Sequence, residues 1–173
     1  MTFTLDSSSI NSADNRAYIL QYGESIASAI SVFKGLSIDD QLAVLWFVYT
    51  EMGLSITPAA TGSARLQLAE GLLNQIKQMN QSEQLEAMRD LASQRDTPIS
   101  RSYGIFSPNT KLAFWYELSE LMVKGFVVPM PANYQLSRDG FQVLAALQEL
   151  DFGEQITVLR KIVSDMGVDT LAE

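Results

Sequence analysis

The chain has 173 residues, of which 47% are hydrophobic, and it carries a formal net charge of −8 with neither cysteine nor histidine. This size fits one domain with a hydrophobic core, and the two missing residue types exclude disulfides, cysteine nucleophiles, imidazole bases and metal sites built on Cys or His. The negative charge, with no basic run, disfavours nucleic acid and anionic lipid as partners.

The first 15 residues are polar and lack the basic and apolar regions of a signal peptide. No uninterrupted apolar stretch approaches the ~18 residues that a membrane span needs. We therefore expect a soluble, cytoplasmic protein that does not span a membrane. Its organisation is expected to be an N-terminal arm over 1–20, a helical domain over 21–167 and a C-terminal tail over 168–173.

Polar cap residues and glycines predict the first helices in chain order, and no segment predicts a strand. A weaker helix is expected over 23–34. Ser37 with Asp40 resembles a capping box that opens a helix over 38–52, and Gly53 supplies the left-handed residue that ends it.

The middle of the chain continues this pattern. Thr61 or Ser63 opens a helix to about Met79, and Ser82 begins a third helix. That helix stops before Thr97, because the proline that follows disfavours helical geometry in the preceding residue.

The remaining helices have equally clear ends. After a short turn over 99–104, Ser107 and Pro108 occupy favourable first positions of a helix over 108–124, which Gly125 follows.

Two prolines, at 129 and 131, predict an extended connection. A helix over 137–150 begins at its serine, and Asp151 with Glu154 caps the last helix, which ends at Gly167.

Two of these segments, 37–53 and 151–167, align without a gap. Two interpretations stay open, because cap and hydrophobic periodicity alone make amphipathic helices look alike. If the repeat is real, two related bundles face each other across a pseudo-twofold axis, and their seam suits a ligand. The identical pairs are Gln41/Gln155, Val44/Val158, Leu45/Leu159, Met52/Met166 and Gly53/Gly167.

The helix over 38–52 is apolar nearly all round, which indicates burial on several sides. Leu42, Leu45, Trp46 and Tyr49 fall on one face by their three- and four-residue spacing.

The helix over 108–124 repeats this composition with Leu112, Trp115, Tyr116 and Met122. Composition alone favours plain core packing of both tryptophans over a cofactor site.

At this point the sequence resembles a known family. The strings DQLAVLWFVYTEMG, RDTPI, SPNTK, KLAFWYEL and EQITVLRKIVSDMG resemble, in the same order, the N-terminal helical domain of the orange carotenoid proteins of cyanobacteria. Because no second, mixed α/β domain follows, the chain looks like a free-standing helical carotenoid protein, which argues against the two-domain photoswitch. The resemblance implies an all-α fold of two discontinuous four-helix bundles around a central tunnel for a ketocarotenoid such as canthaxanthin or echinenone.

A carotenoid is an apolar rod of about 25 to 30 Å, as long as a 20-residue helix, and therefore needs a tunnel rather than a compact pocket. Aromatic and thioether side chains suit such a polyene because they are polarizable. The resemblance implies an aliphatic residue at position 58, where this chain has Pro58, so we expect the tunnel width or the ring position to differ there. The resemblance implies tunnel roles for Leu42, Leu45, Trp46, Tyr49, Gly62, Leu66, Met88, Leu112, Trp115, Tyr116, Met122, Met130, Thr157 and Val163.

Two polar residues correspond to a partner-facing surface in the two-domain relatives. Arg160 is unsuited to an unpaired core position, and Asn109 matches the family's asparagine on the same face. Their retention implies docking of a separate, C-terminal-domain-like carotenoid carrier or of the phycobilisome. Plain surface exposure and retained ancestry explain them equally well.

The resulting expectation is a non-enzymatic, monomeric photoprotective protein that quenches singlet oxygen, with antenna excitation as a second target and the thylakoid-bound antenna as a second location. The alternative is an interaction module that docks to an antenna complex or a carotenoid-delivering protein. An enzyme, such as a lipid-modifying protein, has little support without His, Cys or a metal motif. No catalytic residue and no metal ligand is assigned.

Overall fold

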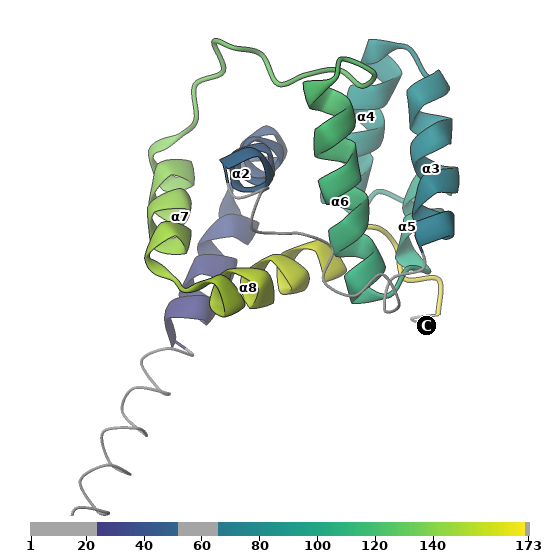
Figure 1. The fold of residues 1–173 in the computed structure, drawn as a ribbon. Coiled ribbons are helices and arrows are strands. Elements are labelled where there is room, and N and C mark those ends of the chain that lie inside the picture. The colour runs from purple at the N-terminus through teal and green to yellow at the C-terminus, as the bar shows by residue number, and fades with distance from the viewer. Residues whose placement is uncertain (1–23, 52–65, 172–173) are drawn as a thin grey trace, which may run out of the picture.

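The computed structural model describes residues 24–51 and 66–171, and these ranges contain helices and no strand. Figure 1 shows the helices and the longer connection that joins α6 to α7. In chain order they are a helix over 24–35, α2 (Ile38–Glu51), α3 (Leu66–Gln78), α4 (Gln81–Ala92), α5 (Pro98–Gly104), α6 (Pro108–Val123), α7 (Arg138–Glu149) and α8 (Phe152–Ser164).

The helices form two groups that the chain does not build in one pass. The helix over 24–35 lies with α2, α7 and α8, whereas α3, α4, α5 and α6 lie together on the other side (Figure 1). The first group therefore contains segments from both ends of the described chain. This arrangement confirms the expected all-α class with two bundles, and it is the first bundle that is discontinuous in the chain.

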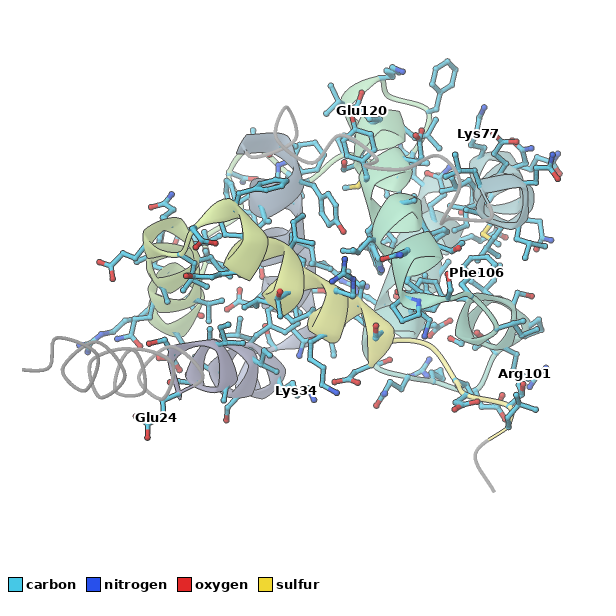
Figure 2. All side chains as sticks on the ribbon, turned by 60° about the horizontal axis from the view of Figure 1, so that its bottom comes forward. Glu24, Lys34, Lys77, Arg101, Phe106 and Glu120 are labelled. Atoms are coloured by element: carbon cyan, nitrogen blue, oxygen red, sulfur yellow. The ribbon has the colours of Figure 1, made fainter. Side chains whose placement is uncertain are left out.

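The two groups share one hydrophobic core, because α8 packs on α6, and α2 packs on both α4 and α6. Phe114 and Leu118 of α6 and Val158 and Leu159 of α8 are all completely buried. Figure 2 views the side on which α8 crosses the molecule, with Lys34 near its end. Lys34 Nζ lies 2.7 Å from Asp165 Oδ2 there and joins the first helix to the end of α8.

Three of the predicted helix starts are confirmed by the hydrogen bonds of their N-cap side chains. The side chains of Ser107, Ser137 and Asp151 accept hydrogen bonds from the third residue of α6, α7 and α8 respectively. Glu154 closes a capping box by accepting from the Asp151 amide at 3.1 Å. Gly125, at φ 80°, follows α6 as its sequence position predicts.

Two predicted boundaries are wrong. The predicted start at Ser82 is two residues late, because Asn80 caps α4 and shares a reciprocal capping box with Glu83. The segment predicted as a short turn over 99–104 is instead the helix α5, which Thr97 caps through the Ser100 amide. At the start of α4, asparagine is as good an N-cap as serine, and Glu83, three positions after Asn80, decides at which of the two residues the helix begins.

Asp40 does not close the capping box predicted for α2. Its amide donates to Ser37 Oγ at 3.2 Å, but its carboxylate accepts from Tyr134 Oη at 2.7 Å and from the Ser137 amide at 3.3 Å. The Asp40 carboxylate therefore bonds Tyr134 and Ser137, which are distant in the chain, instead of the Ser37 amide that a capping box would use. Asp40 thus ties the start of α2 to the start of α7.

The last helix also ends earlier than Gly167. Asp165 is the C-cap of α8, and Gly167, at φ 75°, donates its amide to Leu91 O at 2.9 Å. A Cβ at Gly167 would stand 2.5 Å from the ring of Tyr103. Glycine is therefore required here to let the chain pass α5, rather than to finish α8.

The aligned segments share a contact at their N-terminal ends. Gln41 donates to Leu36 O at 3.3 Å, and Gln155 donates to Leu147 O at 2.8 Å, so each amide satisfies a carbonyl at the end of the preceding helix. Gln84 bonds Ile76 O in the same way at 3.2 Å, outside the proposed repeat. The same contact therefore occurs at three pairs of consecutive helices in this chain, one of them outside the proposed repeat, so it does not by itself support the repeat.

Several predictions fall outside the described residues. These are the N-terminal arm over 1–20, the helix starts Thr61 and Ser63, the repeat members Met52 and Gly53, the altered position Pro58 and the tunnel residue Gly62.

Candidate functional site

A cavity of about 160 Å³ lies between α2, α4, α6 and the connection over 128–134. Most of its wall is apolar. Its lining residues are Asp39, Leu42, Ala43, Leu45, Trp46, Tyr49, Leu85, Met88, Arg89, Trp115, Ser119, Met122, Val128, Pro129, Met130, Pro131 and Tyr134.

The α2 wall follows from the helical period of its sequence. Leu42, Leu45, Trp46 and Tyr49 share the face that was expected from their spacing, and all four line the cavity. Tyr49 is fixed there, since its hydroxyl donates to Leu112 O at 3.2 Å. Complete burial raises the pKa of Tyr49 far above its usual value, so the phenol stays neutral.

The indole of Trp115 is held by a chain of buried hydrogen bonds. Trp115 Nε1 donates to Tyr103 Oη at 2.9 Å, and that hydroxyl donates to Val163 O at 2.6 Å. Tyr103 is itself completely buried, and its ring lies 5.8 Å from that of Phe106, labelled in Figure 2, and 5.3 Å from that of Phe114. This cluster fixes the orientation of the indole in the cavity wall.

The connection over 128–134 is held in place by Gln84 of α4. Gln84 Oε1 accepts from the Val128 amide at 2.8 Å, and Gln84 Nε2 donates to Phe126 O at 3.2 Å. At the other end, Tyr134 donates to Asp40. Burial and the neighbouring Asp40 carboxylate raise the pKa of Tyr134 to about 12. An extended segment without its own helix is thereby fixed as a wall.

One end of the cavity is charged. Arg89 Nε and Nη2 donate to the two carboxylate oxygens of Asp39 at 2.8 Å and 3.0 Å, and Arg89 Nη1 donates to Glu86 Oε1 at 2.7 Å. The hydrogen bonds with Asp39 and Glu86 raise the pKa of Arg89, so this guanidinium stays charged.

The residues present fit part of a carotenoid. The α2 wall runs over eleven residues from Asp39 to Tyr49, and its two ends are about 15 Å apart at the helical rise. This length accommodates one ring and the adjoining part of a polyene of about 25 to 30 Å, and the rest of the rod must lie beyond this cavity. The three thioethers and the two indoles around it, from α2, α4, α6 and the connection, are polarizable surfaces for a conjugated chain.

The structure brings together eight of the residues expected in the tunnel. They are Leu42, Leu45, Trp46, Tyr49, Met88, Trp115, Met122 and Met130.

The other expected tunnel residues lie elsewhere. Leu112 is buried and its carbonyl accepts from Tyr49, whereas Tyr116 and Leu66 are half-buried, and none of the three lines the cavity. Val163 is completely buried, and exposed Thr157 donates back to Gly153 O at 2.9 Å. Their roles remain predictions.

Sequence reasoning missed nine lining residues. Arg89 and Leu85 had a signal, since they flank Met88 on one face of α4 at helical spacing. Asp39, Ser119 and Tyr134 had none, because polar residues do not suggest the wall of an apolar cavity. The others are Ala43, Val128, Pro129 and Pro131.

The two residues expected to face a partner lie on neighbouring helices. Arg160 Nε of α8 donates to Asn109 Oδ1 of α6 at 3.1 Å on an exposed part of the surface. They are therefore one surface feature, and its role towards a partner remains a prediction.

Two further properties apply to the described ranges only. Within 24–51 and 66–171, no three His, Cys, Asp or Glu residues are grouped as they would be around a metal ion. No helix in the same ranges has the length and hydropathy to cross a membrane.

Known proteins resemble this chain over most of its length. Residues 20–169 match the family model described as the N-terminal part of orange carotenoid protein. An orange carotenoid-binding domain-containing protein of Nostoc sp. strain PCC 7120 is 70% identical over 173 residues, all of both chains. The orange carotenoid-binding protein of Limnospira maxima is 51% identical over 84% of this chain, which spans only 46% of that longer protein.

Solved structures agree with these matches. The orange carotenoid protein of Anabaena (Nostoc) sp. PCC 7120 binding canthaxanthin superposes with a TM-score of 0.78 at 51% identity, over 85% of this chain and 48% of that one. The red carotenoid protein of the same organism, also binding canthaxanthin, gives 0.74 at 41% identity over 82% and 97%. The fold, the apolar cavity and these matches together show that the chain belongs to the family of the N-terminal domain of orange carotenoid proteins.

Proposed function

We propose that this chain binds a ketocarotenoid, such as canthaxanthin or echinenone, with one end group in the cavity between α2, α4 and α6. The observation that carries this proposal is the cavity wall, in which Trp46, Tyr49 and Trp115 lie with three methionines. Such a wall offers close contact to a polyene without requiring hydrogen bonds along its length. The two solved relatives that bind canthaxanthin support the choice of ligand.

The function of the complex is photoprotection by physical quenching of singlet oxygen, with antenna excitation as a second target. A bound polyene supplies low-lying excited states that accept excitation energy and release it as heat. The protein's own contribution is to hold the rod, to keep water away from it and to fix its ring. No group in this scheme forms a covalent bond with the ligand.

The test is an absorption spectrum of protein purified from cells that make ketocarotenoids. The wild type should co-elute with a structured visible band, and the Trp46→Ala, Trp115→Ala double variant should lose most of it. Phe141→Ala is the matched control, because Phe141 is 61% exposed on α7 and lies outside the cavity. A colourless, folded wild type from pigment-rich cells would overturn the proposal.

A second function is favoured by the surface of α6 and α8. Arg160 bonds the neutral amide of Asn109, and among the described residues no carboxylate lies within ion-pair distance of it. An exposed, uncompensated guanidinium suits an acidic docking surface, such as that of the phycobilisome or of a C-terminal-domain-like carotenoid carrier. Pull-down binding that survives loss of pigment, and that Arg160→Glu abolishes, would support this role.

A further inference from the structure

The cavity combines an apolar wall with one charged pair. Among its lining residues, Asp39 and Arg89 are the two that carry charge. They come from different helices, Asp39 from the first turn of α2 and Arg89 from the last turn of α4. The pair therefore lies at the end of the cavity where α2 begins, about 15 Å along α2 from Tyr49 at the helical rise.

The pair is held rigidly at this end. Both oxygens of Asp39 accept from Arg89, which gives a two-point contact, and the exposed Glu86 accepts from Arg89 Nη1. The side chains of Arg89 and Asp39 are 36% and 44% exposed, so the pair closes the cavity only partly against water. A fixed guanidinium edge at the end of an apolar wall is an orienting feature.

The Arg89 guanidinium has hydrogen-bond donors that its contacts to Asp39 and Glu86 do not use. Its contacts to Asp39 and Glu86 use three N–H groups, fewer than a guanidinium carries, and the described residues provide no further acceptor for it. Without a ligand, water satisfies these donors. An unsubstituted hydrocarbon ring that displaces this water leaves them unpaired, whereas a ring bearing a carbonyl oxygen accepts from them.

We propose that Asp39 and Arg89 form a polar subsite that selects the end group of the bound carotenoid, favouring a ring with a keto oxygen at its outer edge over a hydrocarbon ring. This inference rests on the proposed carotenoid binding and specifies which end group the cavity takes. The Arg89 guanidinium is the donor, and Asp39 holds it at the cavity end.

The experiment is competitive loading of the apoprotein with an equimolar mixture of β-carotene, which has no oxygen, and canthaxanthin, which has a keto group on each ring. Extracted pigment is then quantified. The wild type should enrich canthaxanthin about three- to tenfold, the value expected for one net hydrogen bond. In Arg89→Met, which keeps an unbranched side chain without donors, the enrichment should fall close to parity.

Two further variants separate selection from folding. Glu86→Gln is the matched control, because Glu86 does not line the cavity and the glutamine oxygen still accepts from Arg89 Nη1, so this variant should keep the wild-type enrichment. Because Arg89→Met leaves Asp39 without its partner, the Asp39→Leu, Arg89→Met double variant removes both charges together. This double variant should also take up canthaxanthin and β-carotene in nearly equal amounts. It replaces the single variant in the test if Arg89→Met does not fold.

The outcomes distinguish this inference from the proposed function. A wild type that takes up both pigments equally overturns the subsite directly, as does unchanged enrichment in a folded Arg89→Met variant. A wild type that takes up neither pigment overturns carotenoid binding itself. Enrichment that Arg89→Met loses and Glu86→Gln keeps establishes the subsite.

Discussion

The hydroxyl of Tyr103 joins two buried groups, accepting from Trp115 Nε1 at 2.9 Å and donating to Val163 O at 2.6 Å. It thereby connects the cavity wall on α6 with the last turn of α8. Because all three residues are at most 4% exposed, neither Trp115 Nε1 nor Val163 O has water as an alternative partner.

Tyr103→Phe should lower the free energy of unfolding by about 1 to 3 kcal/mol, since it leaves a buried donor and a buried acceptor without their shared partner. Urea unfolding measures this change. The variant should also broaden the visible band of bound pigment, because Trp115 loses its anchor. Tyr116→Phe is the control; Tyr116 lies on α6 beside Trp115, is half-buried and does not line the cavity. Equal losses in the two variants would contradict this role of Tyr103.

Asp40 should make stability depend on acid pH. Burial alone would raise the pKa of its carboxyl, but hydrogen bonds from Ser137 and Tyr134 outweigh burial, and the pKa is lowered. A carboxyl with a lower pKa in the folded state stabilises the fold above its unfolded pKa of about 3.9, and the stabilisation is lost as pH falls through the folded value.

The Asp40→Asn variant should therefore melt at a temperature that varies less between about pH 2 and pH 5 than that of the wild type. Thermal denaturation by circular dichroism across this range is the measurement. Asp139→Asn, an exposed acid in the first turn of α7, should leave the pH profile of the wild type intact. A profile unchanged in Asp40→Asn would show that other carboxylates govern acid stability.

Gln84 and Gln155 bond the preceding helix in the same way, but Gln84 alone holds a cavity wall. Gln84→Leu should cost about 1 to 3 kcal/mol and weaken pigment binding, because the buried Ile76 carbonyl and the part-buried Val128 amide and Phe126 carbonyl lose their partner. Gln155→Leu, which loses only its bond to Leu147 O, should cost about 0.5 to 1.5 kcal/mol and leave pigment binding unchanged. Urea denaturation and pigment titration of both variants measure these two effects. Weakened pigment binding in both variants would mean that general destabilisation, rather than loss of the cavity wall, lowers the affinity.

Bound carotenoid should stabilise the protein, because only the folded state offers the cavity. At a free ligand concentration 100 times the dissociation constant the gain is about 2.7 kcal/mol. Melting curves of verified pigment-free and pigment-loaded samples give this difference directly. The Trp46→Ala, Trp115→Ala variant should show a smaller shift, and coincident curves for the two wild-type samples would refute the linkage.

The sequence by itself determined the described helices other than α5, and the apolar face of α2. Ser107, Ser137 and Asp151 fix helix starts through contacts within a few residues, and such local contacts can be read from spacing. The face of Leu42, Leu45, Trp46 and Tyr49 follows from the helical period for the same reason. The register of α4 was missed because Asn80 and Ser82 are both good caps and only the reciprocal contact with Glu83 chooses between them.

Only the tertiary structure decided where the cavity ends and what closes it. Asp39 and Arg89 are 50 residues apart, and Asp40 and Tyr134 are 94 residues apart, so neither contact has a local signal. The Asp40 carboxylate was free to cap its own helix but instead bonds the connection before α7. Contacts of this kind depend on how segments far apart in the chain pack together, and packing is set by the whole core rather than by any one segment.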